Sequence, residues 1–187
     1  MQTAEPLSRL IKKEIIPLDW CHEDLAAKEF FCTFGDKTFW IFGIKEARKL
    51  LNSPDVLSLG KEWYRHEAFP EKVGSGIKRI DFEADKFLSE LGYVHNRESN
   101  TYFAHNPSDK RIALFSHQGF GLAFLSSVLD IPYPLFATHF DVSHSSVTVI
   151  EFPNCEGEII PTVLQLSNDS HIYKEGIPTS YNNRILF

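Results

Sequence analysis

The stretch Arg111-Ile-Ala-Leu-Phe-Ser-His-Gln-Gly119 decides the predicted fold of this 187-residue chain. Residues 112–115 form a short apolar run, which is typical of a strand buried on both faces of a parallel sheet. After a polar turn at residues 116–118, the segment Gly119 to Leu129 is apolar almost all round and predicts a buried helix. A buried strand followed at once by a buried helix indicates an α/β sheet with parallel strands at its centre.

The flanking segments supply further elements of both kinds. Apolar residues at helical spacing predict helices over residues 4–13, 45–51 and 77–91. Short apolar or β-branched runs predict strands over residues 15–18, 93–97, 101–104, 146–152 and 162–167. We therefore expect an α/β fold, a three-layer sandwich with a mostly parallel central sheet.

The composition is that of one soluble globular domain, residues 1–187, with 43% apolar and 24% charged residues. The formal net charge is −6 and basic residues form no block, which argues against nucleic acid or a membrane surface as partner. No apolar run reaches the length of a membrane span, and the N-terminus does not resemble a signal peptide. Three scattered cysteines favour reduced thiols and a cytoplasmic location. The composition does not indicate an oligomeric state.

The segment 30–76 departs from the regular pattern because aromatic residues crowd into what looks like long loops. We interpret it as a lid or insertion within the domain, since long loops in small domains are often functional. The alternative is a satellite core, in which the same aromatic side chains pack under the loops.

His117 lies where ligands bind in open α/β sheets, at the carboxyl end of the predicted strand and the start of the predicted helix. The free N–H groups of a helix N-terminus attract phosphate, and Gly119 allows the backbone to approach a ligand closely. The sequence therefore predicts an anion site with an imidazole beside it. In the alternative, His117 only caps the helix. A serine-hydrolase elbow is excluded, because Leu114 and Gln118 stand where its two glycines belong.

Several stretches, taken in order, resemble the histidine phosphatase superfamily of the phosphoglycerate-mutase-like kind. The stretch from Ile112 to Gly119 is similar to the family's second histidine segment, and Ser145-Ser-Val-Thr-Val149 to a later strand. Asn168-Asp-Ser-His-Ile-Tyr173 resembles a closing segment of a bacterial subgroup. Gln2-Thr3-Ala4 resembles the end of an N-terminal family motif, and Asp19-Trp-Cys-His-Glu23 the region of the acidic proton donor.

The resemblance implies hydrolysis of a small organic phosphate through a phosphohistidine intermediate, without a cofactor or a metal ion. It makes His117 the second catalytic histidine and Glu23 the proton donor, with Glu29 as the alternative donor. Glu23 can also be a solvated carboxylate in a charged turn. The substrate phosphate would be bound by the residues around the histidine, namely Ser116, Gln118 and Gly119.

The family's Arg-His-Gly segment, which carries the phosphorylated histidine, is missing from this sequence. Arg65-His66-Glu67 is a poor substitute, because no buried strand precedes it and a glutamate replaces the glycine. We therefore expect the C-terminal portion of such a domain, truncated at the N-terminus and inactive as given. The alternatives are a non-catalytic phosphate-binding remnant or interaction module, a phosphoglycerate mutase, and an incomplete gene model.

The spacing of His139, Asp141 and His144 resembles that of metal ligands. Two histidines and an aspartate in a loop often occur together by chance, and the resemblance implies no metal. We expect none to bind here.

Overall fold

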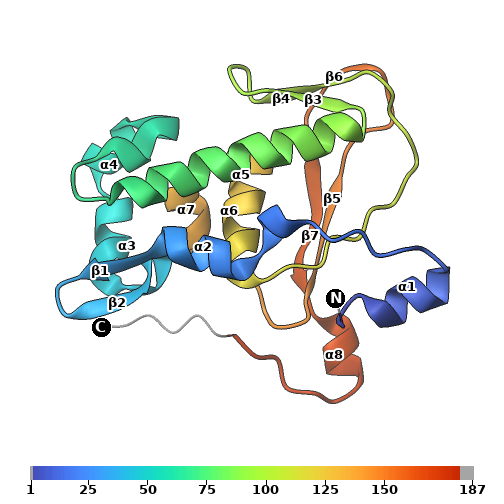
Figure 1. Cartoon of the computed structure of the whole chain (residues 1–187), viewed down its shortest axis with the longest axis horizontal. Helices are drawn as coiled ribbons and strands as arrows, with labels where there is room; N and C mark the ends of the chain where they lie inside the picture. The colour runs from blue at the N-terminus through green and yellow to red at the C-terminus, as the bar shows by residue number, and fades with distance from the viewer. Residues whose placement is uncertain (1, 182–187) are drawn as a thin grey trace.

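The longest helix, α5, crosses the molecule in Figure 1 and packs against α2, α6, β3 and η3. The computed structural model describes residues 2–181, so the two ends of the predicted domain, residues 1 and 182–187, lie outside the described part. The α-helices are α1 Glu5–Ile11, α2 Glu23–Phe30, α3 Lys45–Leu51, α4 Pro54–Ser58, α5 Glu71–Glu90, α6 Gln118–Leu129, α7 Tyr133–His139 and α8 Ser170–Lys174. Short 3-10 turns are η1 Asp19–Cys21, η2 Ile41–Gly43 and η3 Gly60–Arg65.

The strands pair only with antiparallel neighbours in the part of the chain that the structure describes. They are β1 Phe31–Phe34, β2 Lys37–Trp40, β3 Tyr93–Asn96, β4 Thr101–Ala104, β5 Val147–Glu151, β6 Gly157–Ile159 and β7 Thr162–Asn168. They form three small sheets, β1-β2, β3-β4-β6 and β5-β7. The expected three-layer sandwich with a mostly parallel central sheet is therefore wrong.

The prediction fails at residues 111–115, the apolar run from which it was drawn. These residues belong to no strand, and no backbone hydrogen bond joins residues 107–116 to any other described residue. Ile112 and Phe115 are 54% and 44% exposed. A strand exists only when a neighbour takes up its N–H and C=O groups, and no other described segment lies in register here.

An apolar segment with free backbone groups is an open edge that invites association. We expect the chain to self-associate with rising concentration, and we expect Ile112→Lys with Phe115→Lys to reduce that association, as measured by light scattering. Tyr173→Lys is the matched control, because Tyr173 is 83% exposed on α8, away from this edge. A wild-type chain that stays monomeric at high concentration would contradict the prediction.

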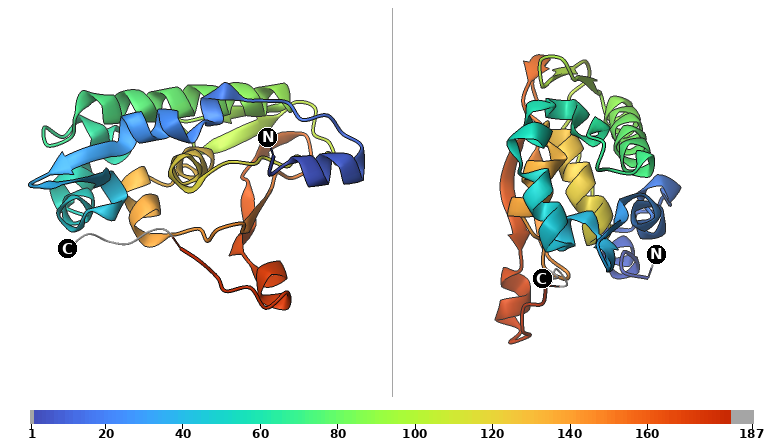
Figure 2. Two further views of the ribbon diagram at one scale, coloured as in Figure 1. Left: turned by 60° about the horizontal axis from the view of Figure 1, so that its bottom comes forward. Right: turned by 90° about the vertical axis from the view of Figure 1, so that its left-hand side faces the viewer.

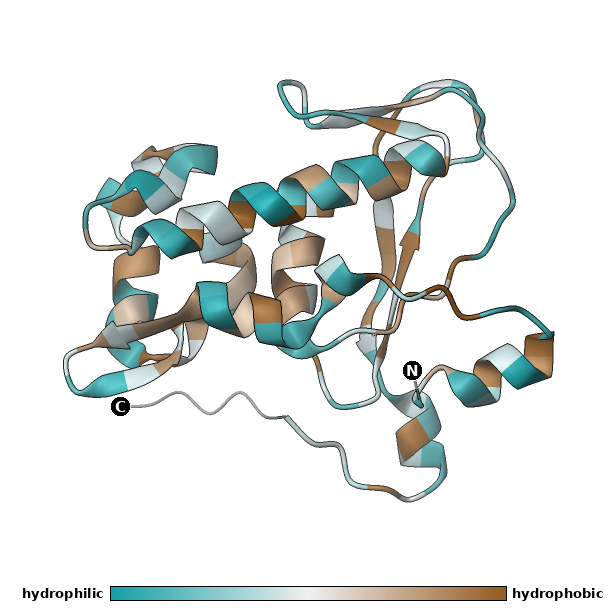
Figure 3. Ribbon diagram, viewed as in Figure 1, coloured by the Kyte–Doolittle hydropathy of each residue, from teal (hydrophilic) through white to brown (hydrophobic). Residues whose placement is uncertain are grey.

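Helix α6 is the central element of the fold. In the right-hand view of Figure 2, the β5–β7 ribbon lies on one side of α6 and α5 on the other. Figure 3 shows the resulting difference in sequence: α5 carries teal and brown stripes, whereas α6 is mostly brown to white. A helix that is apolar all round has to be covered on several sides, so the predicted buried helix is confirmed.

The aromatic residues of segment 30–76 belong to the main core. Phe30, Phe42 and Trp63 are at most 1% exposed, and they share one buried cluster with Phe120 of α6 and Phe136 of α7. A smaller cluster joins the second half of α5 to the β3-β4-β6 sheet. The rings of this segment thus pack beneath its loops and hold α2, α3 and α6 together.

The three cysteines lie in different surroundings. Cys21 and Cys32 are buried and Cys155 is exposed, and none of them forms a disulfide. Burial is the main cause that raises the pKa of the Cys21 thiol to about 12, and it also raises the pKa of Cys32. Separately, no helix in residues 2–181 has both the length and the apolar character that crossing a membrane requires.

Candidate functional site

The start of α6 brings together most of the residues that the sequence singled out. Ser116 and His117 directly precede the helix, and Gln118 and Gly119 are its first two residues. The start of α2 meets it there, because Glu23, the first residue of that helix, reaches the first turn of α6. The association between Glu23 and the His117 segment, 94 positions apart in the chain, was expected from the resemblance alone.

The carboxylate of Glu23 is bound by two backbone donors of α6. The N–H of Gly119 donates to Oε1 at 2.9 Å, and the N–H of Phe120 donates to Oε2 at 2.9 Å. The first N–H groups of a helix have no partner within the helix, and the helix dipole favours a negative charge beside them. The helix start therefore binds a carboxylate of the protein itself.

His117 stands at the N-cap position of α6 with its imidazole exposed. Its backbone is extended, with φ −118° and ψ 167°, and its side chain makes no capping hydrogen bond. His117 is therefore the N-cap residue by its backbone, whose carbonyl accepts from the N–H of Gly121 at 2.8 Å, and its side chain takes no part in capping. Within residues 2–181, no hydrogen bond to the imidazole is formed, so both ring nitrogens are without a protein partner.

Two side-chain hydrogen bonds fix the backbone on either side of His117. The Ser116 hydroxyl donates to the carbonyl of Cys21 at 3.2 Å, which ties the segment to the turn before α2. The Gln118 amide donates to Oδ1 of Asp141, which also accepts from the N–H of Val142 at 2.7 Å. Sequence analysis missed Asp141 as a partner, because only the fold brings it to the helix start.

Gly119 has a packing role that differs from the one predicted for it. A Cβ at this position would lie 2.1 Å from Cη2 and 2.4 Å from Cζ3 of Trp40. The indole thus rests directly on the backbone of the first turn of α6. It also meets Phe31 edge-on at 4.9 Å and stacks on Phe42 at 5.5 Å between ring centroids.

Glu29, the alternative proton donor, is held elsewhere in an ion pair. Its Oε1 and Oε2 accept from Nε and Nη2 of Arg79, both at 2.6 Å. Arg79 also donates to the carbonyl of Trp20 at 2.9 Å, so the pair joins α2 to α5. A forked arginine–carboxylate pair of this geometry is a structural link between helices.

Of the other two sequence motifs, only Asp141 reaches the anion site, through its hydrogen bond with Gln118. Arg65 pairs with Glu62 of its own turn, and Nδ1 of His66 accepts from the N–H of Ala68 at 3.2 Å. Nδ1 of His139 lies 2.9 Å from the carbonyl oxygen of Leu135 in its own helix. Among the described residues, no group of three His, Cys, Asp or Glu side chains is arranged to hold a metal ion.

A buried polar cluster at the other end of α6 was not anticipated. The ring of His95, 1% exposed, lies between two carboxylates, with Nδ1 2.7 Å from Asp85 Oδ1 and Nε2 2.7 Å from Asp130 Oδ2. Arg97 donates to both oxygens of Asp85 at 2.7 Å, and Lys61 donates to Asp130 at 3.0 Å. The two-residue spacing of His95, in β3, and Arg97, directly after it, was the available signal that both point to one face.

Charge pairing decides the ionisation of this cluster. Burial disfavours the charged form of His95, but the hydrogen bonds with Asp130 and Asp85 outweigh it and raise the pKa of the imidazole. Burial likewise opposes ionisation of Asp85 and Asp130, but hydrogen bonds with His95 outweigh it and lower the pKa of both carboxyls. The cluster is therefore a charged network in which each group stabilises its neighbours.

The start of α6 can bind one anion through two N–H donors, and His117 directly precedes this helix with an exposed side chain. Five of the described arginines are engaged elsewhere, namely Arg9 with Glu5, Arg48 with backbone carbonyls, Arg65 with Glu62, Arg79 with Glu29 and Arg97 with Asp85. Arg111, six residues before His117, is exposed. The described residues thus place two backbone N–H donors where they bind a carboxylate. Comparisons with protein-family models, with curated proteins and with solved structures find no match to this chain.

Proposed function

We propose that this chain binds a phosphomonoester at the start of α6, as part of a phosphoryl-handling domain of the histidine-phosphatase kind. The observation that carries the proposal is the pair of 2.9 Å hydrogen bonds from Gly119 and Phe120 to the Glu23 carboxylate. A phosphoryl group offers the same kind of acceptor with more charge, so it competes for the same donors.

Glu23 and His117 then have complementary roles. Release of the Glu23 carboxylate opens the two N–H donors to the ligand and leaves its carboxyl group beside the leaving oxygen, where a proton donor is needed. The exposed imidazole of His117 can donate to a phosphoryl oxygen. We expect binding without turnover, because no described residue at the helix start is placed as a nucleophile with a partner base.

A titration of inorganic phosphate and phenyl phosphate tests the proposal. The amide resonances of Gly119 and Phe120 are expected to shift, and Glu23→Gln is expected to raise the phosphate affinity about tenfold, about 1.4 kcal/mol. The gain is expected because the variant removes a negative charge that occupies the donors. His117→Ala is expected to weaken binding in the Glu23→Gln background.

Asp24→Asn is the matched control for the Glu23 variant. Asp24 is the next residue along α2, is exposed, and interacts with His22 rather than with α6. Asp24→Asn changes the net charge by the same amount. If it raised the phosphate affinity as much as Glu23→Gln does, the gain would come from the lower net negative charge and not from freeing the two N–H donors. Phosphate that shifts neither amide would refute the proposal.

A further inference from the structure

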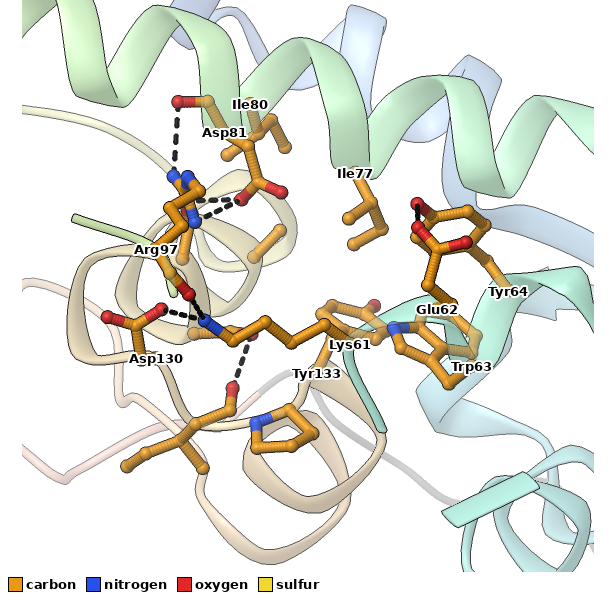
Figure 4. A pocket seen from close by; sticks show the side chains of 15 residues that line it. Lys61, Glu62, Trp63, Tyr64, Ile77, Ile80, Asp81, Arg97, Asp130 and Tyr133 are labelled. Atoms are coloured by element: carbon orange, nitrogen blue, oxygen red, sulfur yellow. Dashed lines mark hydrogen bonds and ion pairs between the residues drawn. The ribbon is translucent and has the colours of Figure 1, made fainter. Parts of the chain in front are cut away.

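A cavity of about 220 Å³ lies beside the second half of α6, at a different place from the anion site. It is lined by residues of η3, α5, α6 and the turn before α7, and it is open to solvent on one side (Figure 4). Its lining divides into an apolar part and a polar part. The apolar part is formed by aromatic and aliphatic side chains, chiefly Trp63, Tyr64, Ile77, Ile80 and Ile131.

The Tyr133 hydroxyl, in the wall of this cavity, has no hydrogen-bond partner. Tyr133 is 1% exposed, and its oxygen is unpaired within residues 2–181. Figure 4 shows the hydroxyl between Lys61 and Ile77. A buried hydroxyl without a partner costs about 1–3 kcal/mol, which a ligand or a bound water recovers by hydrogen bonding to it.

Asp81 presents a second unused polar atom. Its Oδ1 accepts from the Ser127 hydroxyl at 2.6 Å and pairs with Nη1 of Arg97 at 3.2 Å. No such contact joins Oδ2 to the rest of the described chain, and in Figure 4 one carboxylate oxygen of Asp81 points into the cavity without a dashed line. Burial, the largest cause, raises the pKa of this carboxyl, so Asp81 lacks full compensation for its charge.

The rest of the lining favours an apolar ligand body. The ring of Tyr133 is stacked with Trp63 at 5.5 Å and with Phe30 at 5.3 Å between centroids, so its faces are already covered by the protein. The ring of Tyr64 and the side chains of Ile77, Ile80 and Ile131 line the cavity. A volume of about 220 Å³ admits one small ring with a short substituent, and an apolar ring suits this lining.

We propose that this cavity binds a small aromatic carboxamide, or a molecule with the same planar body and a donor–acceptor edge. Its N–H group donates to Oδ2 of Asp81, and its carbonyl accepts from the Tyr133 hydroxyl. Lys61 and Arg97 are already paired with Asp130 and Asp85, so they do not recruit an anion. The inference is independent of phosphate binding at the helix start.

Benzamide and methyl benzoate form the test pair, because they have nearly the same shape and only the amide has an N–H donor. Benzamide is expected to bind with roughly millimolar affinity and to shift the methyl NMR signals of Ile77, Ile80 and Ile131. Methyl benzoate is expected to bind at least fivefold more weakly. Equal binding of the two would overturn the proposal.

Two variants test the assigned contacts separately. Asp81→Asn keeps the acceptor toward Ser127 and turns an N–H₂ group to the cavity, so benzamide binding is expected to fall at least fivefold. Tyr133→Phe removes only the unpaired hydroxyl, so it is expected to melt no lower than wild type while binding benzamide several-fold more weakly.

The control is Tyr173→Phe, the same change at an exposed residue of α8. It is expected to leave both melting and benzamide affinity unchanged. Thermal melting of each variant separates loss of binding from loss of folding. If the Asp81→Asn and Tyr133→Phe variants both fold and both bind benzamide as tightly as the wild type, the proposal is overturned.

Discussion

Gly119→Ala is expected to lower the free energy of unfolding by about 2–3 kcal/mol, enough to unfold much of a marginally stable chain. The added methyl group would lie 2.1–2.6 Å from three carbons of the Trp40 ring, well inside van der Waals contact. The indole cannot step aside, because it is packed against Phe31 and Phe42. Urea denaturation followed by circular dichroism measures the loss.

Gly121→Ala provides the matched control two residues further along α6. A Cβ at Gly121 would meet nothing within 4 Å, so only the helix propensity changes. Alanine is favoured over glycine within a helix by up to about 1 kcal/mol, and the control is expected to be stabilised. A Gly119→Ala variant as stable as wild type would mean that Trp40 does not rest on the start of α6.

His95→Phe is expected to cost about 2–3 kcal/mol of unfolding free energy near pH 6. Phenylalanine keeps the ring that stacks on Tyr102, with centroids 4.0 Å apart, but removes both hydrogen bonds to the carboxylates. Asp130, only 5% exposed, would keep Lys61 alone as a partner. Breaking a buried ion pair by removing one member costs more than the pair itself contributes.

The pH dependence of stability distinguishes His95 from a residue that only packs. Because the pKa of His95 is raised in the folded state, its contribution is complete below about pH 6.5 and is lost as the pH rises through the folded-state pKa. Because the pKa values of Asp85 and Asp130 are lowered, their contribution is present above about pH 4 and is lost on acidification. Wild-type stability is therefore expected to decline above pH 6.5.

Thermal melts from pH 4 to pH 9 measure this dependence. The decline above pH 6.5 is expected to disappear in His95→Phe. His105→Phe, the same change at an exposed histidine, is expected to keep the wild-type profile. A His95→Phe variant with the wild-type decline would show that other groups cause it.

Sequence periodicity was sufficient for the elements that local chemistry determines. The apolar run after His117 gave α6, residues 45–51 gave α3, and the short runs at 93–97 and 101–104 gave β3 and β4. Each is decided by neighbours in the chain. Helix α5 begins at Glu71, six residues before the predicted start. Its first turns were missed because Gly74 and Gly76 lie in them. These glycines are needed there because Tyr64 packs closely against Gly74 and Glu29 against Gly76.

Long-range pairing was where prediction failed. The composition of residues 111–115 is that of a central strand, but a strand requires a partner with free backbone groups, which composition does not specify. The contacts at the site also divide into those that the sequence predicted and those that depend on distant elements. Proximity of Glu23 to the His117 segment followed from a family resemblance, whereas the contact of Gly119 with Trp40 and the partners of His95 depend on how distant elements meet.

The unequal burial of the three cysteines confines thiol chemistry to one position. Alkylation requires an ionised and accessible sulfur, and burial with raised pKa values withholds both from Cys21 and Cys32. Cys155, exposed in the connection between β5 and β6, is left as the reactive thiol. The native sequence thus carries a built-in attachment point for a fluorophore or spin label, and no cysteine has to be removed before conjugation.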